Sequence, residues 1–77
     1  MVHAFVMVKT HVGSSESILE SVRGVPEVEE AHIVAGAYDL IVEVDADDVQ
    51  DVLGAAARGI RTLDGVAETK TYVSFRD

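Results

Sequence analysis

One short segment combines residue types that can recognise a charged small molecule. In the run Gly36-Ala37-Tyr38-Asp39, a carboxylate and an amphipathic ring follow a glycine that favours a turn. Backbone N–H groups of a turn can bind a carboxylate, and the Asp39 carboxylate can bind an ammonium group. An amino acid carries both charges, so the segment predicts a small polar pocket for one. The alternative is an ordinary hairpin turn in which Asp39 caps nearby backbone N–H groups.

The three histidines do not predict a metal or acid–base centre. We expect His3 and His32 on strands that a third strand separates, and His11 in a loop, so their imidazoles should not converge. The chain has no cysteine, which excludes a thiolate metal site and a cysteine nucleophile. Patterns such as HExxH and GxSxG are also absent. We therefore predict a protein that is not an enzyme and holds no metal ion or cofactor.

The charge balance argues against a nucleic-acid interface. The 77 residues include 14 Asp and Glu against 6 Lys and Arg, which gives a net charge of −8. Binding to phosphates needs clustered Lys and Arg, so we expect no direct contact with nucleic acid. No apolar run is long enough to cross a bilayer, and the first residues lack the pattern of a signal peptide. These features predict a soluble, cytoplasmic protein.

The spacing of apolar residues predicts six elements in the order β-α-β-β-α-β. Alternation predicts strands at about 3–9, 28–35, 38–44 and 69–75, and helical spacing predicts helices at about 15–23 and 49–61. With right-handed crossovers, this order gives an α+β, ferredoxin-like fold, a four-stranded antiparallel sheet with two helices on one face. No linker divides residues 1–77, so we expect a single domain.

Patterns within these elements also predict the two faces of one strand, a tight turn, and the start and packing of the second helix. Strict alternation in 28–35 puts Val28, Glu30, His32 and Val34 on one face, and Glu29, Ala31, Ile33 and Ala35 on the other. We expect Gly36-Ala37 to be a tight connection and Asp45 to Asp48 to start the second helix. Gly54 and Gly59 inside that helix each cost about 1 kcal/mol relative to alanine, which predicts close packing against the sheet or a neighbouring subunit.

The predicted sheet has one face that the helices cannot cover. Both alternating sets of the first strand are largely apolar, Ala4, Val6 and Val8 on one side and Phe5 and Met7 on the other. A strand that is apolar on both faces is usually covered on both faces. A chain this short rarely gains more than about 3–5 kcal/mol from its own core. We therefore predict a homodimer that packs two sheets face to face.

Three motifs resemble the effector domain of Lrp/AsnC regulators, also called the RAM domain. The run from Val34 to Val44, VAGAYDLIVEV, is similar to the family signature V-x-G-x-Y-D followed by apolar residues. Pro26-x-Val28 fits the pattern before the second strand. Leu63-x-Gly65-Val66-x-x-Thr69-x-Thr71 fits the pattern that leads into the fourth strand. The resemblance covers essentially the whole chain, residues 1–77.

The resemblance implies dimers that pack sheet to sheet, higher oligomers built from those dimers, and amino acids bound between them. Carried over by position, the ligand pocket would use Gly36, Tyr38 and Asp39 of the hairpin and Thr69 and Thr71 of the last strand. Family regulators carry an N-terminal helix-turn-helix, whereas this chain starts directly at the first strand. The chain therefore resembles a stand-alone effector domain, which could also assemble with full-length Lrp/AsnC regulators.

The excess of acidic residues, the scarcity of lysine and the abundance of Ala, Val and Asp also resemble proteins of halophilic archaea. Molar salt shortens the Debye length to about 3 Å, which would screen the repulsion within such a chain.

The predicted function is a non-catalytic, oligomeric module that binds a small amino acid or a related metabolite, as an accessory of transcription regulation or a metabolite sensor. One alternative is a small dimeric α+β barrel enzyme that acts on a small organic substrate, with a His or Tyr between helices and sheet. Another is a purely structural assembly subunit. The sequence leaves open which ligand binds and how many subunits assemble.

Overall fold

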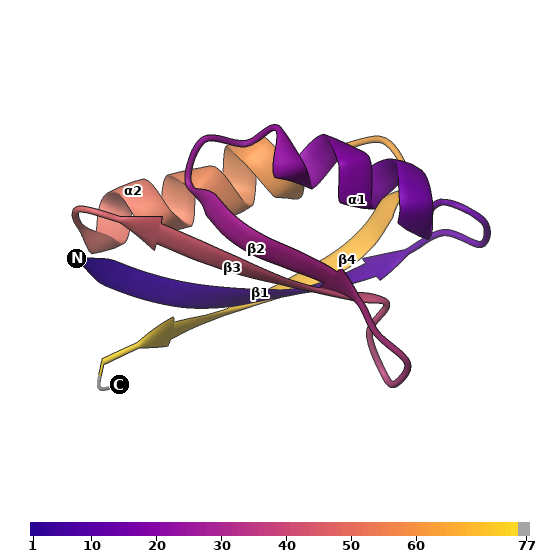
Figure 1. The fold of residues 1–77 in the computed structure, drawn as a ribbon, viewed down its shortest axis with the longest axis horizontal. Coiled ribbons are helices and arrows are strands. Elements are labelled where there is room, and N and C mark those ends of the chain that lie inside the picture. The colour runs from indigo at the N-terminus through magenta and orange to yellow at the C-terminus, as the bar shows by residue number, and fades with distance from the viewer. Residues whose placement is uncertain (76–77) are drawn as a thin grey trace.

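The computed structural model describes residues 1–75, and its elements follow the predicted order (Figure 1). The strands are β1 (Val2–Thr10), β2 (Val28–Ile33), β3 (Leu40–Ala46) and β4 (Val66–Ser74). The helices are α1 (Ser15–Arg23) and α2 (Val49–Gly54), which continues as a π-helical segment, η1 (Ala55–Ile60). Within residues 1–75, no helix has the length and apolar character that a membrane span requires.

The four strands form one antiparallel sheet in the order β2-β3-β1-β4. Both helices lie on the same face of this sheet (Figure 1). The central strand β1 pairs with β3 on one side and with β4 on the other, so that Val6 faces Val42 and Thr71. The predicted ferredoxin-like fold is therefore confirmed. β3 separates the strands of His3 and His32, as expected from the order of the elements.

The core lies between the sheet and the helices and is made of aliphatic side chains. No polar or charged side chain of the described residues is buried. The helix-facing set of β1 is Ala4, Val6 and Val8, which leaves Phe5 and Met7 on the opposite, open face. The buried core consists of Ala4, Val6, Val8, Ile18, Val22, Ala31, Leu40, Val42, Val44, Val52, Ala55, Ala56 and Ile60.

The second helix starts at Val49, as predicted, but only part of the acidic run before it belongs to the helix start. β3 continues to Ala46, and Asp48 is the N-cap residue of α2, where its Oδ1 accepts a hydrogen bond of 2.8 Å from the backbone N–H of Asp51. The expectation that Asp45 already belongs to the helix start was wrong, because Asp45 pairs with His3 across the β1–β3 ladder. Only one acidic residue of the run acts as the cap.

The two glycines of the second helix are explained by neighbours other than the sheet. A Cβ at Gly59 would meet Cγ1 of Val25 at 3.1 Å, in the connection between α1 and β2. A Cβ at Gly54 would collide with the guanidinium of Arg58, which lies over the glycine from the same helix. Within the described chain, Gly59 is therefore close to Val25 and Gly54 to the flexible end of Arg58, and neither glycine is approached by the sheet.

A β-bulge in β2 overturns the predicted division of that strand into two faces. Val28 pairs with Val44, but Glu30 already pairs with Glu43, so one residue is inserted between these pairs. The insertion brings Val28 to the helix side with Ala31, and it leaves Glu30 and His32 on the open face. β2 also ends at Ile33, and residues 34–39 form a longer loop than the predicted tight connection.

The free edge of β2 is partly covered by a side chain from α1. Nη2 of Arg23 donates a hydrogen bond of 3.3 Å to the backbone carbonyl of Ala31. Arg23 is also the basic residue in the last turn of α1, where a positive charge interacts favourably with the helix dipole. One arginine thus serves both the helix end and the sheet edge.

The same isoleucine-to-valine substitution, made at a buried and at an exposed position, tests where the core lies. Ile18 is 1% exposed between α1 and the sheet, and Ile33 is 45% exposed at the end of β2. We expect Ile18→Val to lower the free energy of unfolding by about 0.5–1.5 kcal/mol, because it removes a buried methylene. Ile33→Val should change it by less than about 0.5 kcal/mol. Urea denaturation measures both, and equal effects would contradict the described core.

Asp48 and Asp47 test the cap of α2 in the same way. Asp48→Ala removes the acceptor of the Asp51 N–H and should lower the free energy of unfolding by about 1 kcal/mol. Asp47→Ala changes an exposed carboxylate one residue away and should have a smaller effect in the same denaturation experiment. A larger loss from Asp47→Ala than from Asp48→Ala would place the cap one residue earlier.

Candidate functional site

The connection between β2 and β3, residues 34–39, projects from the end of the sheet on the side away from the helices (Figure 1). Three hydrogen bonds of its backbone close it and attach it to the sheet. The N–H of Val34 donates to the carbonyl of Asp39 at 2.8 Å, and the N–H of Asp39 donates to the carbonyl of Val8 at 2.8 Å. Nζ of Lys9 donates to the carbonyl of Ala37 at 3.3 Å. The hairpin is therefore attached to β1 as well as to its own strands.

The Asp39 carboxylate takes the capping role that was the alternative to ligand binding. Its Oδ2 accepts a hydrogen bond of 2.8 Å from the N–H of Thr10 and one of 3.3 Å from the Thr10 hydroxyl. Both contacts use the same oxygen, so Oδ1 takes no part in them. Within residues 1–75, the N–H groups of Gly36, Ala37 and Tyr38 donate no hydrogen bond to the protein. Donors for an anion and an acceptor for a cation thus occur in one hairpin.

Tyr38 extends from the hairpin to the far edge of the sheet. Its hydroxyl lies 3.4 Å from Oε2 of Glu68 in β4, which places the ring across the end of β1. Glu68 faces Lys9 in the ladder and precedes Thr69 in the chain. The tyrosine therefore connects the hairpin with the start of β4, where the sequence also predicts ligand-binding residues.

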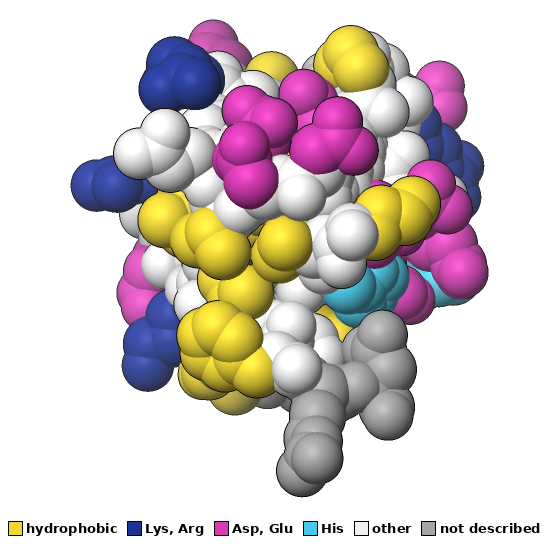
Figure 2. All heavy atoms as spheres, turned by 90° about the vertical axis from the view of Figure 1, so that its left-hand side faces the viewer, with side chains coloured by type: hydrophobic (Ala, Val, Ile, Leu, Met, Phe, Trp, Pro, Cys, Tyr) yellow, Lys and Arg dark blue, Asp and Glu magenta, His cyan; other side chains and the backbone are white. Residues whose placement is uncertain are grey.

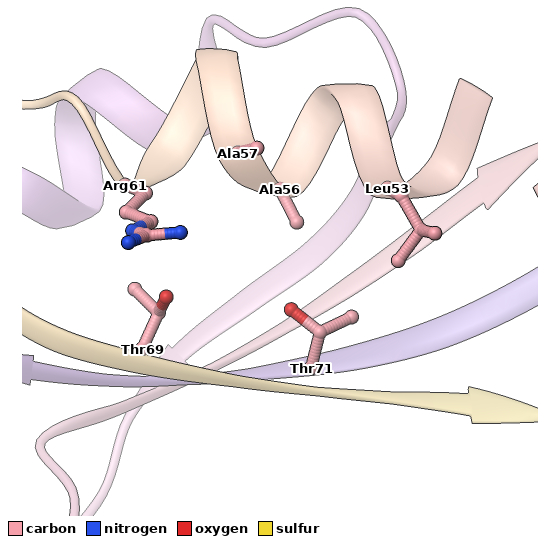
Figure 3. A pocket seen from close by; sticks show the side chains of 6 residues that line it. All are labelled: Leu53, Ala56, Ala57, Arg61, Thr69 and Thr71. Carbon is pink, nitrogen blue, oxygen red and sulfur yellow. The ribbon is translucent and has the colours of Figure 1, made fainter. Parts of the chain in front are cut away.

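Thr69 and Thr71 face the helices. They line an open cleft of about 240 Å³ between β4 and the second helix, together with Leu53, Ala56, Ala57 and Arg61. Figure 3 shows both hydroxyl-bearing side chains rising from β4 toward the helix, with the Arg61 guanidinium above Thr69. The cleft offers two hydroxyls and one cation, a set that can bind a small anionic group.

The five predicted site residues therefore occur in two places. Gly36, Tyr38 and Asp39 lie in the hairpin, and Thr69 and Thr71 lie in the cleft. Both places are at the same end of the sheet, because the first residue of β3 and Thr69 pair with Val8 from opposite sides. Two strand spacings, roughly 10 Å, separate those two positions. A single chain does not combine the five residues in one pocket.

The open face of the sheet carries an apolar stripe. Met7 lies opposite Ile41, and Phe5 lies opposite Tyr72, so the four side chains cross β3, β1 and β4 in one diagonal. Phe5 is 37% exposed and Tyr72 is 56% exposed. This is the uncovered apolar surface that the order of elements predicts.

Beside this stripe lies a group of charged side chains that sequence analysis did not predict. Nδ1 of His3 is 2.6 Å from Oδ1 of Asp45, and its Nε2 is 3.1 Å from Oε1 of Glu43. The hydrogen bond to Asp45, followed by the charges of both carboxylates, raises the pKa of His3 against the opposing effect of partial burial. Both ring nitrogens can donate only when the imidazole is protonated.

Two features could be found only with the register of the sheet. Arg61 follows the last turn of the second helix, and no sequence motif relates it to Thr69. The pairing of His3 with Asp45 joins residues 42 positions apart. The cleft between helices and sheet is lined by neither His nor Tyr, which are the groups that the enzyme alternative requires for proton transfer.

Comparisons with known proteins agree with this geometry. The family model described as the Lrp/AsnC ligand binding domain matches residues 3–77. An uncharacterised HTH-type transcriptional regulator of Pyrococcus furiosus is 33% identical over 75 residues, which cover 94% of this chain and 50% of that protein. The chain thus spans about half the length of the curated relatives that it matches.

Solved structures give the same result. The crystal structure of TTHA0845 from Thermus thermophilus superimposes with a TM-score of 0.95 at 32% identity, and the match covers 100% of this chain and 96% of that one. A transcriptional regulator of Neisseria meningitidis, solved as an L-Met complex, shares the fold with a TM-score of 0.85 at 18% identity over 99% of this chain and 51% of that one. The chain belongs to the Lrp/AsnC family and is a ligand-binding domain of the type found in its transcriptional regulators.

Proposed function

We propose that this domain is a non-catalytic sensor that binds a small amino acid and assembles through its sheet. The observation that carries the proposal is the hairpin 34–39, in which backbone donors without partners in the described chain lie beside the Asp39 carboxylate. The donors suit the carboxylate of an amino acid, and Oδ1 of Asp39 suits its ammonium group. The L-Met complex of the Neisseria meningitidis regulator supports this ligand class.

The ligand site is proposed to be completed by a second copy of the chain. Thr69, Thr71 and Arg61 offer hydroxyls and a cation at the same end of the sheet as the hairpin, but on its helix side. A pocket that uses both groups therefore needs the hairpin of one chain to approach the β4 cleft of another. Such a pocket exists only in an oligomer, which makes assembly and ligand binding depend on one another.

The proposed dimer uses the apolar stripe of Phe5, Met7, Ile41 and Tyr72. Covering apolar surface contributes roughly 25 cal/mol per Å², and a second sheet face supplies a matching flat surface. Relatives that carry a helix-turn-helix offer the same domain, so assembly with full-length Lrp/AsnC regulators is part of the proposal. Nothing in it requires direct contact of this domain with DNA.

The setting that we propose is the cytoplasm of a halophilic archaeon. The acidic excess repels itself less in molar salt, where charges more than about 3 Å apart are screened. Curated relatives in Pyrococcus are consistent with an archaeal source. Binding and assembly should therefore be measured in buffers with molar KCl.

Phe5→Glu tests the sheet-to-sheet dimer. A carboxylate in the centre of the stripe would have to leave water on association, which costs several kcal/mol. We expect the dimer dissociation constant to rise by at least about 100-fold in sedimentation equilibrium. Val12→Glu introduces the same charge at a fully exposed loop position and should leave the constant unchanged. A folded Phe5→Glu variant that dimerises like the wild type would refute this interface.

Asp39 variants test amino acid binding by calorimetry against each of the twenty amino acids. A charge-assisted hydrogen bond contributes about 1.5–3 kcal/mol, so Asp39→Ala should weaken binding by roughly 10- to 100-fold. Asp39→Asn keeps an acceptor for the Thr10 N–H and removes the charge, so it should also weaken binding. Asp64→Ala changes an exposed carboxylate elsewhere and serves as the control. The proposal fails if no amino acid binds or if both Asp39 variants bind as tightly as the wild type.

A further inference from the structure

We propose that Glu30, His32 and Glu43 form a binding site for a divalent transition-metal ion such as zinc on the open face of the sheet. One ligand atom from each residue, an imidazole nitrogen and two carboxylate oxygens, lies within 4.8 Å of the others. The three residues come from β2 and β3, which the ladder holds side by side. The inference is independent of the proposed amino acid site, which uses other residues.

The register of the sheet creates the site. Glu30 and Glu43 are direct partners in the β2–β3 ladder, and His32 follows Glu30 by two positions on the same face. The bulge after Val28 is what brings Glu30 opposite Glu43. In a tetrahedral zinc site with bonds of about 2.0–2.2 Å, two ligand atoms lie about 3.3–3.6 Å apart. Rotation of the exposed Glu30 and His32 side chains is needed to close the remaining gap, up to roughly 1.5 Å.

The electrostatics of this group favour a cation. Like charges directly opposite one another on neighbouring strands are destabilising, and Glu30 and Glu43 are such a pair. Within residues 1–75, the three close ion pairs all use a histidine, and no Lys or Arg neutralises these carboxylates. Nε2 of His32 lies 3.0 Å from Oε1 of Glu30, and a divalent ion shared by His32 and both glutamates would offset the repulsion between the two carboxylates.

Hydrogen bonds from residues outside the three proposed metal ligands hold the Glu43 side chain in place. Nε2 of His3 is 3.1 Å from Oε1 of Glu43, which leaves Oε2 for an ion. Asp45 in turn holds Nδ1 of His3 at 2.6 Å. Ligating carboxylates in metal sites are commonly fixed by hydrogen bonds of this kind. In Figure 2, histidine lies against acidic side chains on one side of the view, with hydrophobic side chains gathered on the other.

The chemistry of the donors selects the type of ion. An imidazole favours zinc and its neighbours among the transition metals, whereas magnesium and calcium prefer sites made only of oxygens. The side chains of Glu30 and His32 are 60% and 56% exposed, and that of Glu43 is 26% exposed. Water or a group from a second chain can therefore complete the coordination. β2 is an edge strand, so the site lies at the margin of the open face.

Titration calorimetry with zinc chloride on EDTA-treated, dialysed protein tests the site. We expect one zinc ion per chain and a rise in Tm on zinc addition that EDTA reverses. His32→Gln and Glu43→Gln should weaken binding by at least about 10-fold, and His3→Gln by about 10-fold through the loss of the contact that holds Glu43. His11→Gln and Glu20→Gln change exposed residues outside the group and should bind like the wild type.

Glu30→Gln separates a metal site from a merely structural cluster. It removes a ligand and also the repulsion with Glu43, so zinc affinity should fall while the Tm of the zinc-free protein stays equal or rises. The proposal is overturned if the wild type shows neither heat nor a Tm change with zinc, if His32→Gln binds zinc like the wild type, or if His11→Gln loses binding as much as His32→Gln does.

Discussion

The structure depends on one constraint: its two helices can cover only one of the two faces of the sheet. Two helices shield one face of four strands, and the thirteen buried hydrophobic residues found within residues 1–75 lie between those two layers. The other face still carries Phe5, Met7, Ile41 and Tyr72, because the strands are apolar on both sides. A domain of this size has little stability to spare, so an uncovered apolar stripe is a strong drive for association. The proposed dimer and the proposed pocket between chains both follow from this constraint.

Local sequence signals were sufficient for the fold and for the first helix. The predicted range 15–23 matches α1, because a serine start, an apolar stripe and a glycine end are all encoded within a few residues. The element order then leaves few topologies, and the right-handed crossover rule selects the observed one. The predicted strand boundaries were wrong where the pairing between two strands sets them. The bulge after Val28 and the end of β2 at Ile33 depend on how β3 pairs, which alternation within one strand does not encode.

In the candidate site, too, features formed by neighbouring residues were predictable, whereas contacts between residues distant in sequence were not. The hairpin from Gly36 to Asp39 was predictable, since its residue types sit next to one another in the chain. The partners of Asp39 were not, because Thr10 lies 29 positions away. The group around Glu43 was also missed. Glu43 of β3 contacts His3 and lies near His32, a relation that the spacing of the histidines alone does not encode.

The Arg23 guanidinium on the carbonyl of Ala31 has a consequence for how copies of this chain can meet. Open strand edges invite further strands to add, and such addition continues without limit into fibres. A bulged, six-residue outer strand with charged neighbours and an arginine bound to its backbone is a poor template for that growth. Strand addition at the β2 edge is thereby disfavoured, which suits the proposed pairing through the open face, since a twofold pairing closes on itself.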